Sequence, residues 1–305
     1  MRSTKKQRKP SPMVGALLAA AWLVALTAGA VLARPIDETR PAAEDVRLTV
    51  ENINGTVTIE GWSKKEVHVT GTLGDGVEDL VFEGSERRLR IEVEFYHRRR
   101  NADGTADLNI KVPVGAEVLV DVVNCPIEVS KVEGSLDLES VNGDITISGK
   151  PMRIEASAVN GDIEISATCK DVKAGNVNGD IILDGVSGEV SAGSVGGTIE
   201  VRGGRFDGCD FGTVSGDIEF TGEFTGSGRY DFEAHSGDVV LTLPANVSAE
   251  FEVSTFSGDI DNDFGPKPRR SSEYGPGKEV TFTTGDGKAR VSVSTFSGDI
   301  RLLKK

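Results

Sequence analysis

Seven aspartates, each directly after a glycine, are the residues whose type and spacing could do chemistry in this chain: Asp144, Asp162, Asp180, Asp217, Asp238, Asp259 and Asp299. Carboxylate oxygens are preferred ligands of calcium, and pairs of carboxyl groups perform glycoside hydrolysis. Glycoside hydrolysis needs two acids in unlike environments, whereas these seven share one sequence context. We therefore expect a ligand-facing row, whose carboxylates either bind cations or accept hydrogen bonds from the turn backbone.

Other motifs of known chemistry are missing from the sequence. It contains no GxSxG nucleophile elbow. It also contains no P-loop and no GxGxxG dinucleotide fingerprint. We expect no catalytic residues and no cofactor, and for the aspartate row we favour hydrogen bonds from the turn backbone over a metal site.

The aspartates belong to a short phrase that recurs at a nearly constant interval. It occupies residues 141–147 (VNGDITI), 159–165 and 177–183, each 18 residues after the last. Further along, the interval widens to 19, then 21, and finally 40 residues. A fixed period in this range marks stacked supersecondary units. The sequence predicts an all-β fold, a single-stranded β-solenoid with about two short strands in each coil of 18–21 residues.

Glycine stands at the centre of each phrase, where the chain must turn between strands. These structural turns are Gly55, Gly143, Gly161, Gly179, Gly197, Gly216, Gly237, Gly258 and Gly298. Asn-Gly and Ser-Gly pairs adopt a positive φ at little cost. The apolar residues around each turn, such as Val159, Ile163 and Ile165, are all expected to face the core. His235 takes the place of Val159 in its copy and is expected to point inward too.

The start of the chain is typical of an export signal. Residues 1–12 carry five basic side chains, and residues 13–33 are uncharged and mostly apolar. Residues 1–33 are therefore a signal peptide, or an N-terminal anchor, because 21 such residues can also span a bilayer. We expect a linker at 34–45 and the solenoid at 46–305, with irregular first coils (46–120) and regular repeats (121–305). The protein is expected in the periplasm, on the cell surface or secreted.

The charge balance excludes some partners. The net charge is −14, and removal of the five basic residues at the start takes it to −19. Such a surface repels nucleic acid and anionic lipid, so membrane contact is expected only through residues 13–33, if these are uncleaved. Cys125, Cys169 and Cys209 lie about two coils apart, too far for a disulfide, and are expected as buried thiols.

The repeated Val/Phe-Asn/Ser-Gly-Asp-Ile phrase resembles the bacterial adhesin-like family of β-strand-repeat proteins, long classed as a domain of unknown function. Residues 50–57 with Gly61-Trp62, the strand ends Val112-Pro113 and Leu243-Pro244, and residues 296–300 fit that pattern. The resemblance covers about residues 46–305. It implies an exported, non-catalytic β-solenoid of the cell envelope. The stretches 124–126 and 195–198 depart from the motif and interrupt the aspartate row.

Three classes of function follow from a long repetitive surface. The first is an adhesin-like or scaffold surface that binds a repetitive envelope partner, such as a polysaccharide, through many weak contacts. The second is a regulatory envelope protein that binds another protein, for example through strands at one end of the solenoid. The third, and least favoured, is a β-helical enzyme acting on polysaccharide. The sequence favours the first.

Overall fold

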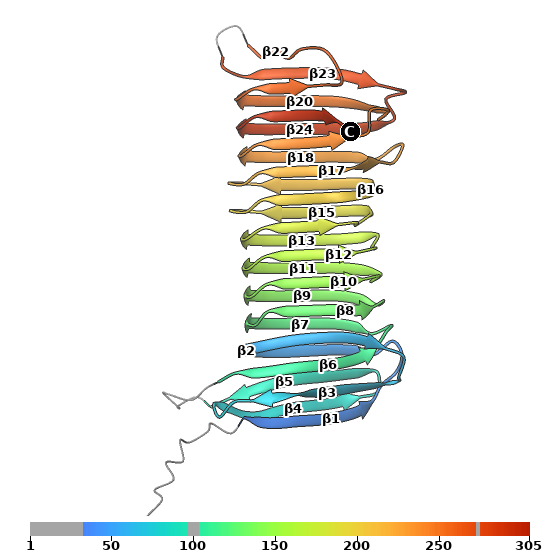
Figure 1. Cartoon of the computed structure of the whole chain (residues 1–305), viewed down its shortest axis with the longest axis vertical. Helices are drawn as coiled ribbons and strands as arrows, with labels where there is room; N and C mark the ends of the chain where they lie inside the picture. Colours follow the sequence, from blue (N-terminus) through green and yellow to red (C-terminus); the bar gives the residue numbers. More distant parts are fainter. Residues whose placement is uncertain (1–32, 97–103, 273–274) are drawn as a thin grey trace, which may run out of the picture. The chain divides into compact units, whose positions relative to one another are not determined.

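In the computed structural model, strands alternate between two rows that stack coil upon coil (Figure 1). The structure describes residues 33–96, 104–272 and 275–305. All of these belong to the compact unit Leu32–Lys305, and every element in the described ranges is a strand. No helix within those ranges could cross a membrane. The signal or anchor expected at 1–33 lies, except for Ala33, outside the described residues.

Row A is the file of parallel and antiparallel strands on one side of the stack. In spatial order it contains β4 (Val77–Ser85), β5 (Arg88–Phe95), the start of β2 (Arg47–Trp62), β7 (Glu117–Asn124), β9 (Ser135–Asn142), β11 (Arg153–Asn160), β13 (Asp171–Asn178), β15 (Gly188–Ser194), the end of β16 (Ile199–Thr213), β18 (Arg229–Ser236), β24 (Ala289–Ser297), β20 (Ala249–Ser257), β23 (Lys278–Thr284) and β22 (Arg269–Arg270).

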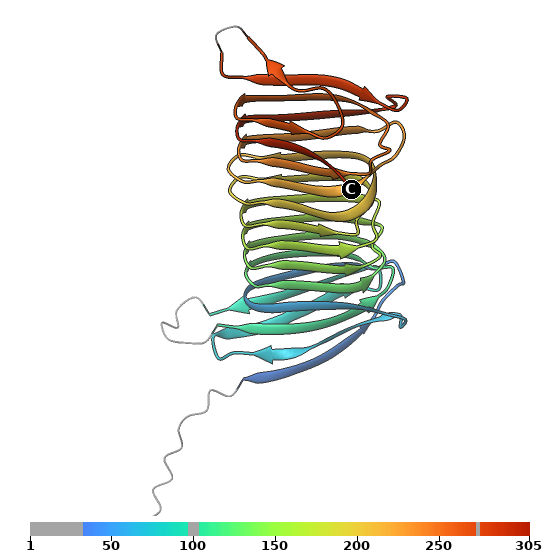
Figure 2. The same ribbon diagram turned by 45° about the horizontal axis from the view of Figure 1, so that its top comes forward.

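Row B lies on the other side, and in each coil the chain passes from one row to the other and back (Figure 2). Its order is β1 (Arg34–Pro41), β3 (Glu66–Leu73), β6 (Ala106–Pro113), the end of β2, β8 (Ile127–Val132), β10 (Ile145–Gly149), β12 (Ile163–Ala167), β14 (Ile181–Asp184), the start of β16, β17 (Ile218–Phe224), β19 (Val239–Leu243), β25 (Ile300–Lys304) and β21 (Ile260–Asn262). The predicted β-solenoid, with two strands per coil, is confirmed.

Residues one repeat apart pair in register and build the core. Ile145 pairs with Ile163, and Ile163 pairs with Ile181, with all three side chains fully buried. On the facing row, Ala156 pairs with Ala174 and is equally buried. In these coils the large residues of row B are accompanied by small ones on row A, an alternation that suits a thin coil.

The turn glycines are required mainly because successive coils approach each other closely. Only three of them have a positive φ: Gly55, Gly161 and Gly179. At Gly197 a Cβ atom would lie 1.9 Å from the carbonyl oxygen of Gly179 in the neighbouring coil. The turn geometry expected from the sequence is therefore only part of the reason. The stacking itself leaves no space for a side chain.

The last coil is not stacked in sequence order. β24 lies between β18 and β20, and β25 lies between β19 and β21. The expectation that successive segments lie directly atop one another is wrong for this coil. The chain first builds the coil of β20 and β21, then the antiparallel β22–β23 pair that covers its outer edge, and returns to fill the space left below.

The opposite end is also closed by antiparallel pairs. Residues 34–41, expected to be part of a linker, form β1, which pairs with β3. Within the irregular first coils, β3 pairs with β6 and β4 pairs with β5, again antiparallel. Antiparallel pairs at the ends cover strand edges that would otherwise template association with another chain.

Candidate functional site

Exposed valines form a continuous line along the outer face of row A, and we call this line the valine row. Alternation along each strand buries the residue three positions before the turn glycine, for example Ser140, so that the next residue points outward. The row runs through Val141, Val159, Val177, Val195 and Val214, each 39–48% exposed. The expectation that these valines face the core is wrong.

Aromatic side chains continue the valine row toward the β22–β23 end. The Phe296 ring stacks between His235, 5.1 Å away, and Phe256, 4.8 Å away, with interplanar angles of 5° and 6°. Phe296 and Phe256 are 50% and 54% exposed, and His235 is exposed as well. The inward position expected for His235 is therefore also wrong. The order of the three rings follows the insertion of the last coil.

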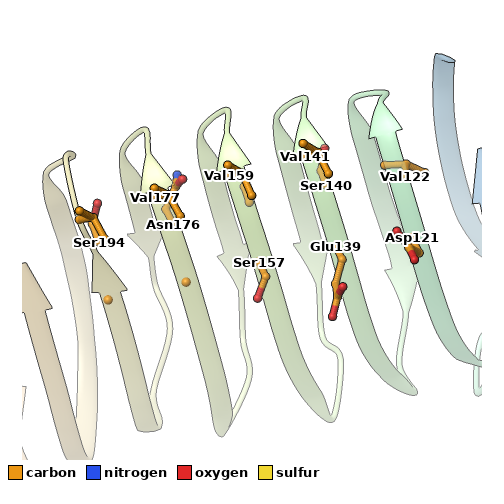
Figure 3. Close-up of a pocket in the computed structure, with 14 residues that line it drawn as sticks. Asp121, Val122, Glu139, Ser140, Val141, Ser157, Val159, Asn176, Val177 and Ser194 are labelled. Atoms are coloured by element: carbon orange, nitrogen blue, oxygen red, sulfur yellow. The ribbon is translucent and has the colours of Figure 1, made fainter. Parts of the chain in front are cut away.

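A groove of about 570 Å³ runs beside the valines across five coils (Figure 3). On β11, β13 and β15 its floor is formed by the small residues four positions before the turn glycine, Ser157, Gly175 and Gly193, whereas β7 and β9 carry Asp121 and Glu139 at the same position. At Gly193 the nearest atom to an added Cβ is 3.9 Å away. The groove exists because these positions carry almost no side chain, while the valines stand along one wall.

The groove is acidic as well as apolar. Of its lining residues, Asp121 and Glu139 carry carboxylates, and none carries a basic group. Farther from the turn on row A lie Asp137 and Glu155. Burial raises the pKa of Asp137, and the neighbouring Glu155 carboxylate raises this pKa further.

The predicted aspartate row exists along the turn edge of the stack, and its carboxylates have a structural role. Asp144 accepts a hydrogen bond of 2.9 Å from the backbone N–H of Asp162, and Asp162 accepts one from Asp180. Thr198 interrupts the row, but its N–H donates to Asp180 at 2.8 Å. Beyond it the pattern continues through Asp217, Asp238, Asp299 and Asp259, with Asp259 also paired to Lys278.

Each of these carboxylates therefore accepts a hydrogen bond from a backbone N–H of the neighbouring coil. Successive carboxylates are separated by the distance between two coils. Within the described ranges no group of three or more His, Cys, Asp or Glu side chains is placed to hold a metal ion. Of the two roles expected for the row, the hydrogen-bonded one is supported by this geometry. The predicted hydrogen bond from a turn backbone is present, but the donating N–H belongs to the turn of the neighbouring coil and not to the aspartate's own turn.

Asparagines directly before the central turn residue, which is Cys125 in one copy and glycine in the others, form a second set of bonds along the axis that was not predicted from the sequence. Asn124 donates to Asn54, Asn142 to Asn124, Asn160 to Asn142 and Asn178 to Asn160, over 2.7–3.0 Å. The signal was available, since the five asparagines occupy one repeat position. An amide can both donate and accept, so identical residues satisfy one another along the axis.

Replacing Asp180 by alanine should lower the free energy of unfolding by about 1 kcal/mol, because the Thr198 N–H loses its acceptor. Asp180→Asn should be tolerated, since the amide oxygen can still accept and a like charge is removed. Urea denaturation followed by circular dichroism measures both. Equal destabilisation by the two substitutions would contradict the structural role of the row.

The three cysteines, Cys125, Cys169 and Cys209, are free and buried. Burial raises the pKa of the Cys125 thiol to about 11, and it also raises the pKa of Cys169 and of Cys209. A thiolate is the reactive form of cysteine. The thiols are therefore poor nucleophiles in the folded protein.

With Ellman's reagent at pH 8, we expect the three thiols to react only after the protein is unfolded. A pKa of about 11, against about 8.5 for a free thiol, lowers the thiolate fraction of Cys125 more than a hundredfold. Labelling in buffer and in guanidinium chloride should differ accordingly. Stoichiometric release of the chromophore from folded protein within minutes would contradict this placement.

The fold is shared with solved structures of low sequence identity. A candidate adhesin from Parabacteroides distasonis is 13% identical and covers 90% of this chain and 98% of its own, with a TM-score of 0.50. A candidate adhesin from Parabacteroides merdae is 6% identical, covers 89% and 97%, and also has a TM-score of 0.50. A candidate lipid-binding protein from Parabacteroides distasonis is 11% identical, covers 88% and 97%, and has a TM-score of 0.47.

No curated protein matches the chain. At these identities the two candidate adhesins, each with a TM-score of 0.50, show the fold alone. A family model gives a stronger result, because it matches residues 46–303, which is most of the sequence. The chain belongs to the Toastrack DUF4097 family.

Proposed function

We propose that this protein is an exported, non-catalytic binding scaffold of the cell envelope. Its binding surface is the valine row together with the groove beside it. The observation that carries the proposal is the exposure of Val141, Val159, Val177, Val195 and Val214 in one continuous file. Aligned apolar side chains on a soluble surface mark interaction sites.

Several weak contacts at a regular spacing would give useful affinity through avidity. Neighbouring strands of a sheet lie about 4.8 Å apart, so five coils offer five similar contacts over about 19 Å. A partner that repeats at a similar interval can engage all of them at once, and the later contacts then form at a high effective concentration. The aspartate row supports the stack rather than the ligand, because its carboxylates already accept bonds between coils.

Support for a non-catalytic role comes from the uniformity of the aspartate row. Asp144, Asp162 and Asp180 each accept the same kind of backbone hydrogen bond from the neighbouring coil, which gives this row no pair of acids with opposed properties. The adhesin-like description of solved structures with this fold agrees with a binding role at the envelope, but those proteins are only 13% and 6% identical.

The test immobilises the full-length, carboxy-terminally tagged chain and measures which components of an envelope extract it retains. Two double variants are compared with the unmodified chain. Gly175→Leu with Gly193→Leu fills the groove floor, where an added Cβ has room. Ser148→Leu with Ser166→Leu places the same two side chains on exposed positions of row B. We expect components retained by the unmodified chain to be lost about tenfold with the first pair and kept with the second.

Both pairs should unfold at the temperature of the unmodified protein, which separates binding from folding. Retention that survives groove filling, or that falls equally with both pairs, would contradict the proposal.

A further inference from the structure

We infer that the groove binds a cationic amphipathic α-helix of a partner protein, laid along the axis of the stack. The inference rests on the proposed function, because it names the occupant of the same surface. It is carried by three properties of the groove: the spacing of its valines, the small residues of its floor and the charges around it.

The spacing favours a helix over an extended chain. Valines on successive coils are separated by about 4.8 Å, the distance between neighbouring strands. An α-helix repeats its apolar face once per turn, about every 5.4 Å, and so drifts by about 0.6 Å per coil. An extended peptide places same-side residues about 6.7 Å apart and drifts by about 2 Å per coil. Aligned at the middle of the groove, a helix of about 13 residues is about 1.2 Å out of step with the coil at each end, against about 4 Å for an extended peptide.

The floor lets the apolar face of a helix approach the sheet. Ser157, Gly175 and Gly193 lie beside the valines and leave a hollow of about 570 Å³. Spread over about 19 Å, this volume is too narrow for a whole helix, whose diameter is about 10 Å. The hollow is wide enough for one line of side chains along the helix. These side chains would fill it, while the valines contact the next line of side chains on the same helix.

The charges around the groove favour a positively charged partner. Carboxylates lie on both sides of the apolar strip: Asp137 and Glu155 farther from the turn, and Asp144, Asp162 and Asp180 along the turn edge. Asp121 and Glu139 stand at one end of the floor. Of the basic side chains on the same strands, Arg153 already contacts Glu155 at 3.3 Å and Asp171 at 3.5 Å, which leaves Lys173. Lysines or arginines flanking an apolar stripe would complement both acidic borders.

The same charges disfavour other occupants. A second copy of this chain would bring acidic borders against acidic borders, and an anionic membrane would be repelled in the same way. A glycan that stacks on aromatic faces finds none in the groove, because none of its lining residues is aromatic. The rings of His235, Phe296 and Phe256 stack on one another, 5.1 Å and 4.8 Å apart, which covers the faces between them.

The direct test uses a fluorescent helical peptide of about 18 residues, with leucines on one stripe and lysines on both sides of it. Its binding to the full-length protein is measured by fluorescence anisotropy. Two comparison peptides carry the same leucines with glutamates, or the same composition in an order that breaks the stripe. We expect the first peptide to bind at least about tenfold more tightly than either comparison, and its affinity to fall as salt is raised.

The protein variants locate the contact. Filling the groove with Gly175→Leu and Gly193→Leu should weaken binding of the lysine peptide about tenfold, whereas Ser148→Leu with Ser166→Leu on row B should leave it unchanged. Equal binding of the striped and scrambled lysine peptides would mean attraction by net charge alone and would overturn the inference. Binding that survives groove filling would overturn it too.

The outcomes separate this inference from the proposed function. If groove filling abolishes retention of envelope material but the lysine peptide does not bind, the groove is the binding surface and its occupant is not a cationic helix. Binding of a neutral alkyl probe in the groove, with no binding of the peptide, would likewise overturn the helix and favour an acyl chain. If groove filling changes neither readout, both proposals fail.

Discussion

Gly197→Ala should lower the free energy of unfolding by about 3 kcal/mol, the upper range for overpacking in a tightly packed site. The added Cβ would lie 1.9 Å from the Gly179 carbonyl oxygen, so the two coils must separate locally. Their turn contacts include the bond from the Thr198 N–H to Asp180. Guanidinium denaturation followed by circular dichroism measures the loss. Because each coil contacts mainly its neighbours, the transition should also broaden.

Gly212→Ala is the matched control. This glycine lies in the same stack, on β16, and an added Cβ would meet no atom within 4 Å. Alanine there should leave stability unchanged or slightly higher, since it restricts the unfolded chain. If both substitutions cost the same, the turn glycines would be required for some reason other than contact between coils.

Phe220→Ala should destabilise the protein by about 4 kcal/mol, as expected for a fully buried aromatic residue. The ring lies 5.1 Å from Phe206 and 5.2 Å from Phe232, in the part of the stack where the repeat widens beyond 18 residues. Longer coils enclose more space there, and aromatic side chains occupy it. Removing the central ring would leave a large cavity. Thermal and chemical denaturation both measure the effect.

Phe296→Ala provides the comparison on the surface. Its ring is 50% exposed and stacks with His235 and Phe256 on the outer surface of the solenoid, so the same truncation should cost no more than about 1 kcal/mol. A large loss at Phe296 and a small one at Phe220 would contradict the division into core and surface rows.

The stacking could be predicted from the sequence because the period is long, regular and repeated. Ile145, Ile163 and Ile181 occupy one repeat position and form one buried file, as expected. The place of the last coil could not be predicted in this way. Residues 249–260 and 289–300 are nearly the same phrase, so hydrophobic period alone does not decide which of them stacks on β18.

The groove is not predicted when every apolar residue near a turn is assigned to the core without regard to strand alternation. Along β11, Ile154, Ala156 and Ala158 are buried, so the alternation places Val159 outside. The phrase after the turn starts a new alternation at Ile163, and the two registers conflict across the glycine. Extending the first register through Val159 would have placed the valine row on the surface from the sequence alone.

The measurement that tests the stacked file of valines most directly introduces cysteine pairs along it, with the native thiols buried and unreactive. Val159→Cys with Val177→Cys places two outward thiols on neighbouring coils, about 4.8 Å apart. Val159→Cys with Val195→Cys places them two coils apart. A short bifunctional thiol reagent should join the first pair rapidly in the folded protein and leave the second unjoined. Thiols at Val159 and Val177 that react only after unfolding, or equal joining of both pairs, would contradict an outward file of valines built by stacked coils.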